Sequence, residues 1–368
     1  MDAYIAIWFI QCCVCLFGTV VTRRRFEELL PAGMLGMVLF AYALGLLGAL
    51  AAGVWIALGL GLLLGLSALA LVLGGRRKFA PERFFTPAFF CYAALLALSA
   101  FVSYGRAVWI WDECSHWAIS VKSMVYARDF STSPLSHILF RSYPPGLTIW
   151  QYFYQALHGL FSGKPFCEWL LYGAYNAFCF ALLLPFLRLV TRKARALSPL
   201  LCAALVLLPM CFFDAPYAMY ESLYVDALLA ILAAYAFYTF RFPGEGGPFV
   251  LLSRCLALAM LPLVKDSGLY FAAALPLCFF LSDWIRMGGK RFFGKPLLPY
   301  AACALSAAAA KLSWSLELHA SGVARAFSQP VDIGLLWRLL TGAEQGYQRA
   351  ILENFARKFF SPALTVLG

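Results

Sequence analysis

The chain has few charged residues for its length. Only 13% of its 368 residues are charged, whereas 63% are hydrophobic and 17% are aromatic. A soluble domain carries about 25% charged and about 45–50% apolar residues, so this chain lacks the polar surface that a water-soluble globule of its size needs. Strict alternation of apolar and polar residues is also missing, which excludes an outer-membrane barrel. The composition therefore predicts an all-α, polytopic integral membrane protein.

The sequence also lacks cysteine pairs with metal-binding spacing and a stripe of basic residues that could bind nucleic acid. Most of the 12 cysteines lie singly in apolar runs, and Cys12, Cys13 and Cys15 lack the CxxC spacing of a zinc or redox site. The formal net charge is +11, but the basic residues lie between the apolar runs rather than in a separate patch. We therefore expect contact with membrane lipids and no nucleic-acid partner.

Ten apolar runs approach the length that crosses a membrane, about 20 residues for a helix. They cover residues 3–21, 33–50, 52–74, 86–105, 167–190, 198–213, 222–240, 249–264, 267–285 and 297–313. The first run is long for a cleaved signal and no basic residue precedes it, so we predict that it is a retained span.

Basic clusters in alternate loops predict the orientation of these spans. They comprise Arg23 to Arg25, then Arg76, Arg77, Lys78 and Arg83, then Arg192, Lys193 and Arg195, and finally Arg286, Lys290, Arg291 and Lys295. Lysine and arginine in short loops bias those loops to the cytoplasm. Since most acidic residues lie in the intervening loops, we expect these loops on the extracytoplasmic face of a cell (inner or plasma) membrane.

The predicted spans divide the chain into four parts. Residues 1–105 hold the N-terminal spans, 106–166 an external loop with juxtamembrane helices, 167–313 a transmembrane core, and 314–368 an external segment with the start of a further span. The apolar run from Tyr143 to Phe161 should have external flanks on both sides. We expect it to lie along the interface or to enter and leave one leaflet, unless one upstream span is miscounted. The last run reaches Gly368, as expected for a fragment of a longer protein.

Two adjacent carboxylates stand out in the external loop. Asp112 and Glu113 follow a span and lie between tryptophans that suit the headgroup level. If a helix continues from Trp111, Asp112 and His116 lie one turn apart on one face. A carboxylate in a partly dehydrated pocket gains proton affinity and can accept a proton from a hydroxyl group. The simpler interpretation is a pair of charges that only meets water at the end of a span.

Further polar residues recur in this loop and at the outer ends of later spans. They are Lys122, Tyr143, Asp214, Tyr217, Tyr220, Glu221, Asp226, Lys265 and Asp266. Ionisable groups at a membrane edge tend to face a polar cavity, and a shared external cavity accounts for the recurrence. Lys265 can equally extend its ammonium group to the interface, and Tyr143 with Pro144 and Pro145 can simply begin a helix. Both interpretations stay open.

These elements resemble the GT-C superfamily of membrane glycosyltransferases. The likeness rests on the Asp-Glu pair, the Tyr-Pro-Pro segment at Tyr143, the Tyr-Glu-Ser sequence at Tyr220 and the Lys-Asp-Ser-Gly sequence at Lys265, within residues 109–281. Such enzymes use polyprenyl-phosphate sugars, as protein O-mannosyltransferases, aminoarabinose transferases and bacterial wall-polymer glycosyltransferases do. The resemblance implies a GT-C-like transmembrane helical bundle with an external loop of amphipathic helices. This chain departs from the family pattern in two places. The Asp-Glu pair usually follows the first span, whereas here three further predicted spans precede it, and we expect no large soluble C-terminal domain within these 368 residues.

The resemblance also implies roles for single residues. Asp112 would be the general base for the acceptor hydroxyl, with Glu113 positioning the acceptor or holding a metal, and we add His116 as the neighbouring imidazole. Lys265 would bind the donor phosphate, with Arg106 and Lys122 as substitutes. On the acceptor side we expect Tyr143, Pro144, Tyr220, Glu221 and Asp266. A single displacement by a hydroxyl inverts the anomeric centre, so the expected enzyme is an inverting transferase of the cell envelope.

The expected donor is a polyprenyl-phosphate-linked sugar, and the acceptor is a hydroxyl on a polymer, lipid or protein. We assign no metal, although Asp112, Glu113, Glu221 and Asp266 would suit a divalent ion if the fold brought them together. Two other functions stay open. A transporter or flippase for lipid-linked glycans should show repeated halves or broken helices, and an O-antigen-ligase-like transferase would rely on arginines in a large external loop.

Overall fold

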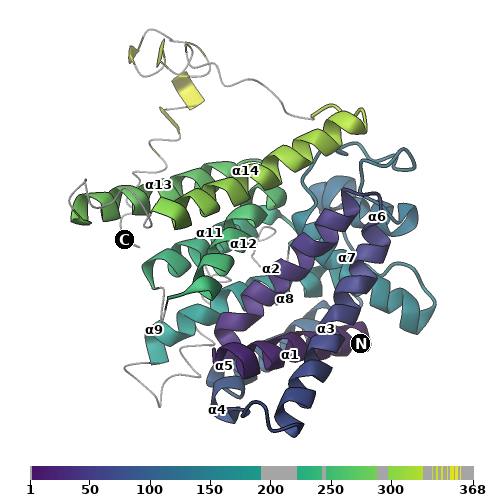
Figure 1. Cartoon of the computed structure of the whole chain (residues 1–368). Helices are drawn as coiled ribbons and strands as arrows, with labels where there is room; N and C mark the ends of the chain where they lie inside the picture. Colours follow the sequence, from purple (N-terminus) through teal and green to yellow (C-terminus); the bar gives the residue numbers. More distant parts are fainter. Residues whose placement is uncertain are drawn as a thin grey trace. The chain divides into compact units, whose positions relative to one another are not determined.

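All regular structure in the described part of the chain is helical. The computed structural model describes residues 2–191, 222–242, 246–287 and 297–325, and scattered positions between 334 and 357. The helices are α1 (Asp2–Thr22), α2 (Phe26–Gly45), α3 (Leu50–Leu73), α4 (Pro81–Phe84), α5 (Pro87–Ser103), η1 (Glu113–Trp117), α6 (Ala118–Ala127), α7 (Gly146–Ser162), α8 (Trp169–Leu183), η2 (Leu184–Phe186), α9 (Leu187–Thr191), α11 (Val225–Arg241), α12 (Pro248–Val264), α13 (Gly268–Met287) and α14 (Leu297–Ala320) (Figure 1). The chain separates into two units, Met1–Ala326 and Phe327–Gly368, and all of these helices belong to the first unit.

Five helical segments in the described residues are long and apolar enough to cross a membrane. They are α1, α2, α3, the continuous helix Trp169–Leu189 and α13. This confirms the predicted all-α fold, and the five helices agree in length and composition with a membrane protein, while the predicted run 198–213 lies outside the described residues. Two boundary predictions are wrong. α14 continues to Ala320 rather than ending at residue 313, so the predicted division between residues 313 and 314 falls inside a helix. α2 begins at Phe26 rather than residue 33, because Glu27 and Glu28 occupy its first turn, where carboxylates favour the helix dipole.

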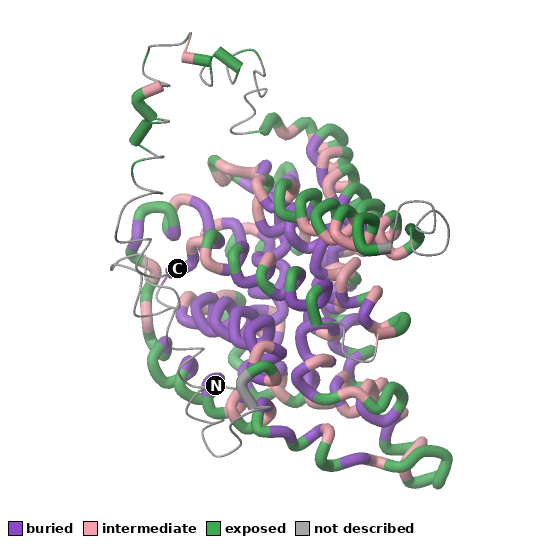
Figure 2. Tube along the Cα trace, turned by 90° about the vertical axis from the view of Figure 1, so that its left-hand side faces the viewer, coloured by how far each residue is buried: buried purple, intermediate pink, exposed green. Residues whose placement is uncertain are grey.

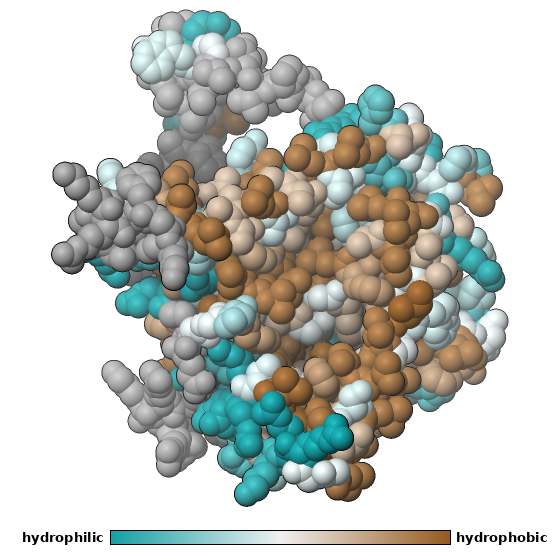
Figure 3. All heavy atoms as spheres, viewed as in Figure 1, coloured by the Kyte–Doolittle hydropathy of each residue, from teal (hydrophilic) through white to brown (hydrophobic). Residues whose placement is uncertain are grey.

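Burial separates the inner helices from those that face outward. In the apolar stretch of Trp169–Leu189, 94% of the residues are buried, against 28% in α3 and 17% in α13. Figure 2 shows this contrast between buried interior turns and exposed outer ones. Large apolar side chains such as Leu66, Leu73, Phe101 and Ile285 are exposed on the outer helices. In Figure 3 apolar residues dominate the middle of the visible face and hydrophilic ones gather near α4, as expected for a surface that lipid covers.

Two glycines of α3 bring that helix against α1. A Cβ atom on Gly61 would lie 2.6 Å from Cγ2 of Ile10, and one on Gly65 would lie 2.6 Å from Cβ and Sγ of Cys13. Their spacing places both glycines on one helix face, which is the small-residue pattern that lets membrane helices approach closely. The Leu- and Gly-rich α3 therefore packs through its glycines and exposes its leucines.

α7 lies antiparallel to the first half of the α8–α9 helix. Gln155 exchanges two 2.8 Å hydrogen bonds with the backbone of Cys167, and the Trp150 indole donates to the carbonyl of Ala174 at 2.9 Å. α7 therefore begins beside the middle of the α8–α9 helix and ends beside the start of α8. It is enclosed by helices along most of its length rather than laid on the surface.

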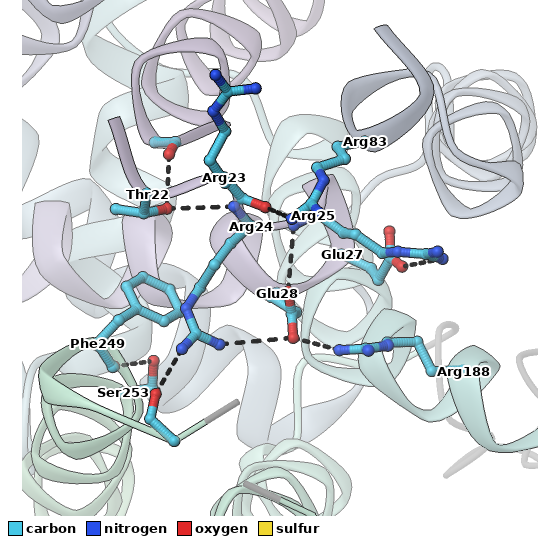
Figure 4. A network of polar contacts seen from close by, with 12 residues as sticks. Thr22, Arg23, Arg24, Arg25, Glu27, Glu28, Arg83, Arg188, Phe249 and Ser253 are labelled. Atoms are coloured by element: carbon cyan, nitrogen blue, oxygen red, sulfur yellow. Dashed lines mark hydrogen bonds and ion pairs between the residues drawn. The ribbon is translucent and has the colours of Figure 1, made fainter. Parts of the chain in front are cut away.

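The basic loops meet at one end of the bundle (Figure 4). Arg24 lies 3.7 Å from the Glu28 carboxylate, which also pairs with Arg188 of α9. The Arg24 guanidinium donates to the Gly246 carbonyl at 2.5 Å and lies 4.9 Å from the centre of the Phe249 ring in α12. These contacts join the α1–α2 loop to α9 and to the start of α12. We call this set of contacts the basic-end network.

A second carboxylate belongs to the same end. Glu27 is buried, accepts a 2.8 Å hydrogen bond from Thr86 before α5, and lies 3.8 Å from Arg25. Arg83 of α4 donates to the carbonyl of Arg23. The loops predicted to be cytoplasmic at residues 23–25 and 76–83 are therefore neighbours, whereas Arg192, Lys193 and Arg195 lie outside the described residues.

Candidate functional site

Polar side chains from five separate segments meet at the opposite end of the bundle. α12 begins beside Arg24 and ends at Lys265, so its length separates this end from the basic-end network. We call the following residues the polar cluster: Asp112 before η1, Tyr143 before α7, Asp226 in the first turn of α11, Lys265 and Asp266 between α12 and α13, and Lys311 in α14.

Two ion pairs join four residues of the polar cluster, and the carboxylates act electrostatically on Tyr143. The Lys265 ammonium lies 2.6 Å from Oδ1 of Asp226, and Lys311 pairs with Asp266. Partial burial raises the pKa of Tyr143, and the negative charges of Asp112, Asp226 and Asp266 raise it further. The phenol therefore lies within electrostatic range of these three carboxylates and stays protonated at neutral pH. The sequence prediction that Asp112, Tyr143, Lys265 and Asp266 share a site agrees with this arrangement.

The turn between α12 and α13 explains the Lys-Asp-Ser-Gly sequence in physical terms. Lys265 leaves α12 with extended backbone angles, and the Gly268 amide donates to its carbonyl at 2.8 Å. A Cβ atom on Gly268 would lie 2.1 Å from the carbonyl oxygen of Leu261, so only glycine fits. The tight turn places Lys265 and Asp266 at adjacent positions on the end of the bundle.

A second glycine brings the Tyr-Pro-Pro segment to this turn. A Cβ atom on Gly146 would lie 2.7 Å from the carbonyl oxygen of Leu263, so the start of α7 touches the backbone at the end of α12. Pro144 is buried, and Tyr143 is half-buried beside it. The contact at Gly146 therefore places Tyr143, three residues before it, near Lys265, two residues after Leu263.

The two lysines of the polar cluster are less exposed than their carboxylate partners. The Lys311 side chain is 16% exposed against 56% for Asp266, and Lys265 is 29% exposed against 62% for Asp226. Exposed carboxylates in such pairs contribute little to stability, about 0–1 kcal/mol. An anionic ligand can therefore replace them as the partner of the lysines at small cost.

Glu113 lies in a different environment from Asp112. Its side chain is fully buried and accepts a 2.7 Å hydrogen bond from the Tyr172 hydroxyl and a 2.6 Å hydrogen bond from the Leu223 amide. Arg106, predicted to bind phosphate, lies with its guanidinium carbon 4.5 Å from the centre of the Tyr172 ring. Glu113 therefore joins η1 to α8 and to the start of α11, and Asp112 next to it is exposed.

The segment Glu113–Trp117 is a π-helix rather than the α-helix considered from the sequence. Its wider i→i+5 turn removes residues four apart from a common face. Asp112 is exposed while His116 is buried, so the expected acid–imidazole pair does not form. We correct that prediction.

His116 is instead buried inside the bundle, where its ring packs against Tyr143. Its Nδ1 lies 3.4 Å from the Ser120 hydroxyl, and Nε2 has no partner among the described residues. The imidazole and Tyr143 ring centres are 4.0 Å apart. Burial lowers the pKa of His116 to about 3, so the ring is neutral at physiological pH.

The remaining predicted residues are not part of the polar cluster. Lys122 is exposed on α6, with its ammonium 5.7 Å from the centre of the Phe166 ring, and it borders a depression lined by Cys114 and His137. Tyr220 and Glu221 lie outside the described residues, as do Asp214 and Tyr217. In the described part of the chain, no three His, Cys, Asp or Glu side chains lie close enough together to hold a metal ion.

The sequence interpretation missed Lys311. It is the one charged residue in the predicted span 297–313, and an ionisable residue within an apolar run usually marks a polar site. Tyr172 and the Leu223 amide were missed as well, and no sequence signal points to them. Comparisons with family models, curated proteins and solved structures find no match to this chain.

Proposed function

We propose that the protein is an inverting glycosyltransferase that moves a sugar from a polyprenyl-phosphate donor to a hydroxyl acceptor at the extracytoplasmic face of the membrane. The polar cluster is the observation that supports this proposal. It combines an exposed aspartate, a protonated phenol and two lysines at one end of a bundle with membrane-length helices. An isoprenoid tail can remain in lipid while cations bind its phosphate at the headgroup level.

Each group has a task in a single displacement. Asp112 takes the proton of the acceptor hydroxyl as the hydroxyl oxygen attacks the anomeric carbon. The bond from that carbon to the phosphate oxygen breaks, and the leaving phosphate gains negative charge. Lys265 and Lys311 stabilise this charge after exchanging their carboxylate partners for the phosphate. One displacement inverts the anomeric centre, so a second nucleophilic carboxylate is not required.

The buried neighbours act through position. Glu113 fixes the backbone beside Asp112 through its hydrogen bonds to Tyr172 and Leu223. Neutral His116 supports the ring of Tyr143, whose hydroxyl can donate a hydrogen bond to the sugar or the phosphate. In this proposal Glu113 is thus a positioning residue rather than a contact of the acceptor or a metal.

Asp112→Asn tests the base assignment. The purified full chain is assayed with a panel of polyprenyl-phosphate sugars for transfer and hydrolysis, and donor binding is measured separately. We expect the variant to bind the donor normally and to lose about 10²–10⁴-fold in turnover. Asp2→Asn, which neutralises an exposed carboxylate in the first turn of α1, should keep full activity. Turnover by Asp112→Asn at the original rate refutes the base, and movement of the lipid without transfer identifies a flippase.

Lysine variants test how the phosphate is bound. Lys265→Met and Lys311→Met should each weaken donor binding by about 10-fold or more, since a hydrogen bond to a charged group contributes about 1.5–3 kcal/mol. Lys122→Met removes a cation outside the polar cluster and should leave binding unchanged. A larger loss of donor binding for Lys122→Met than for the other two variants would indicate that the phosphate binds at α6.

A further inference from the structure

An apolar groove lies between α1, α3 and the segment around α4. Its volume is about 510 Å³, within the roughly 300–1,000 Å³ range of ligand pockets. The lining includes Phe9 and Cys13 of α1, Leu66 and Leu69 of α3, and Phe79 and Phe84 near α4, and no charged residue borders it. Phe9 is 59% and Leu66 63% exposed, so the groove opens to the outside of the bundle. Gly65 and Cys13, in close contact, form part of its wall.

A strip of positive charge adjoins the groove. Arg76, Arg77 and Lys78 are consecutive and exposed, and they directly precede Phe79, which lines the groove. None of these three side chains forms an ion pair or hydrogen bond within the described residues. The acidic residue of this loop is Glu82, which is also exposed, so residues 76–83 hold one carboxylate and four cations, of which the fourth is Arg83.

We propose that this groove binds one acyl chain of an anionic phospholipid, whose headgroup phosphate contacts Arg76, Arg77 and Lys78. The apolar wall accommodates hydrocarbon, and the cations at one end match a phosphate at the membrane surface. The site is distinct from the polar cluster. The second half of α3 and α4 lie toward the basic-end network, where Arg83 contacts Arg23, and the polar cluster lies at the other end of the helices. The inference does not depend on the proposed transferase activity.

Binding of defined lipids to the purified, delipidated full chain tests the charge match. Native mass spectrometry measures the affinity for phosphatidylglycerol and for phosphatidylcholine with the same acyl chains. Phosphatidylglycerol should bind at least about 10-fold more tightly. Because each basic residue near an anionic lipid surface contributes about fivefold, Arg76→Gln with Arg77→Gln should weaken its binding about 30-fold. Arg241→Gln with Arg286→Gln removes two exposed arginines elsewhere and should leave this affinity unchanged.

A groove-filling variant tests where the acyl chain lies. Leu66→Trp places a larger side chain in the groove and should abolish the tight site, whereas Leu63→Trp, on an exposed face of α3 outside the groove lining, should not. Equal affinity for the two lipids overturns the proposal, because the groove would then bind acyl chains without recognising the charge of the headgroup. Equal losses from the two arginine pairs overturn it in favour of non-specific attraction.

Alkylation of the wild-type protein gives a result that does not depend on the folding of a variant. Cys13 lines the groove, whereas Cys278 is exposed on α13. Phosphatidylglycerol should slow modification of Cys13 by a membrane-permeant maleimide at least about fivefold relative to Cys278, as followed by peptide mass spectrometry. An unchanged ratio places the lipid elsewhere and overturns the proposal.

Discussion

Asp112 and Glu113 are adjacent in the chain yet have opposite environments. The sequence could predict the pair, because two carboxylates between tryptophans at the end of a span are visible as a pattern. It could not predict that Glu113 is buried, because its partners Tyr172 and Leu223 are 59 and 110 positions away. The separation of roles within the pair is therefore a property of tertiary contacts. The same holds for Lys311, whose partner Asp266 is 45 positions away.

His116 gives a prediction at the level of one residue. Burial lowers its pKa from the usual 6.5 to about 3, so between these values the unfolded chain binds a proton that the folded protein does not. The stability that depends on neutral His116 is complete above pH 6.5 and is lost as the pH falls toward 3. The loss approaches about 1.4 kcal/mol per pH unit.

His116→Phe keeps an aromatic ring against Tyr143 and removes the titration. Melting temperature in detergent should therefore fall less steeply for the variant than for the wild type between pH 7 and pH 4.5. Parallel slopes would show that His116 is not buried in its neutral form.

At the level of helices, the sequence predicts what depends on local pattern. Long apolar runs gave most of the spans, because a helix that faces lipid must be apolar over most of its length. Local pattern is insufficient at α7, whose apolar and aromatic residues suit an interfacial helix as well as a buried one. Hydrogen bonds from Trp150 and Gln151 to α8 decide between them, and these depend on the packing of two helices.

The contact between α1 and α3 gives a prediction for a whole helix. Gly61→Val should force α3 away from Ile10, since even a Cβ atom there would lie 2.6 Å from Cγ2. Overpacking of this kind costs about 1–3 kcal/mol, so we expect a melting temperature several degrees lower in detergent. Gly59→Val is the matched control on the same helix, because nothing lies within 4 Å of a Cβ atom there. Equal losses for both variants would point to the helix itself rather than to the contact.

At the scale of the molecule, the described charged loops divide between two ends. The basic-end network and the polar cluster are separated by the length of α12, which agrees with the alternation of basic and acidic loops in the sequence. The basic residues could be assigned to one side because loop charge is a local signal. The pairing of Lys265 with Asp226 and of Lys311 with Asp266 needs the arrangement of three helices and was not predictable.

Thiol labelling in intact cells tests which end is external. Cys114 is exposed beside Asp112, and a membrane-impermeant maleimide should label it without permeabilisation. Arg77→Cys places a thiol at the exposed loop of the opposite end, and this thiol should react after permeabilisation alone. Site-resolved mass spectrometry distinguishes the two positions. The reverse pattern would place the polar cluster in the cytosol and refute the proposed extracytoplasmic reaction.

The partly buried contacts of Arg24 have a mechanical consequence. A single guanidinium contacts the α2 carboxylate Glu28, the carbonyl of Gly246 and the ring of Phe249, so the helices that meet there cannot separate without losing several charge-assisted contacts together. At the far end, the lysine pairs have exposed carboxylates and resist separation only weakly. The basic end should therefore stay closed, and any widening that admits a bulky molecule should begin at the polar cluster, where the exposed carboxylates part from Lys265 and Lys311.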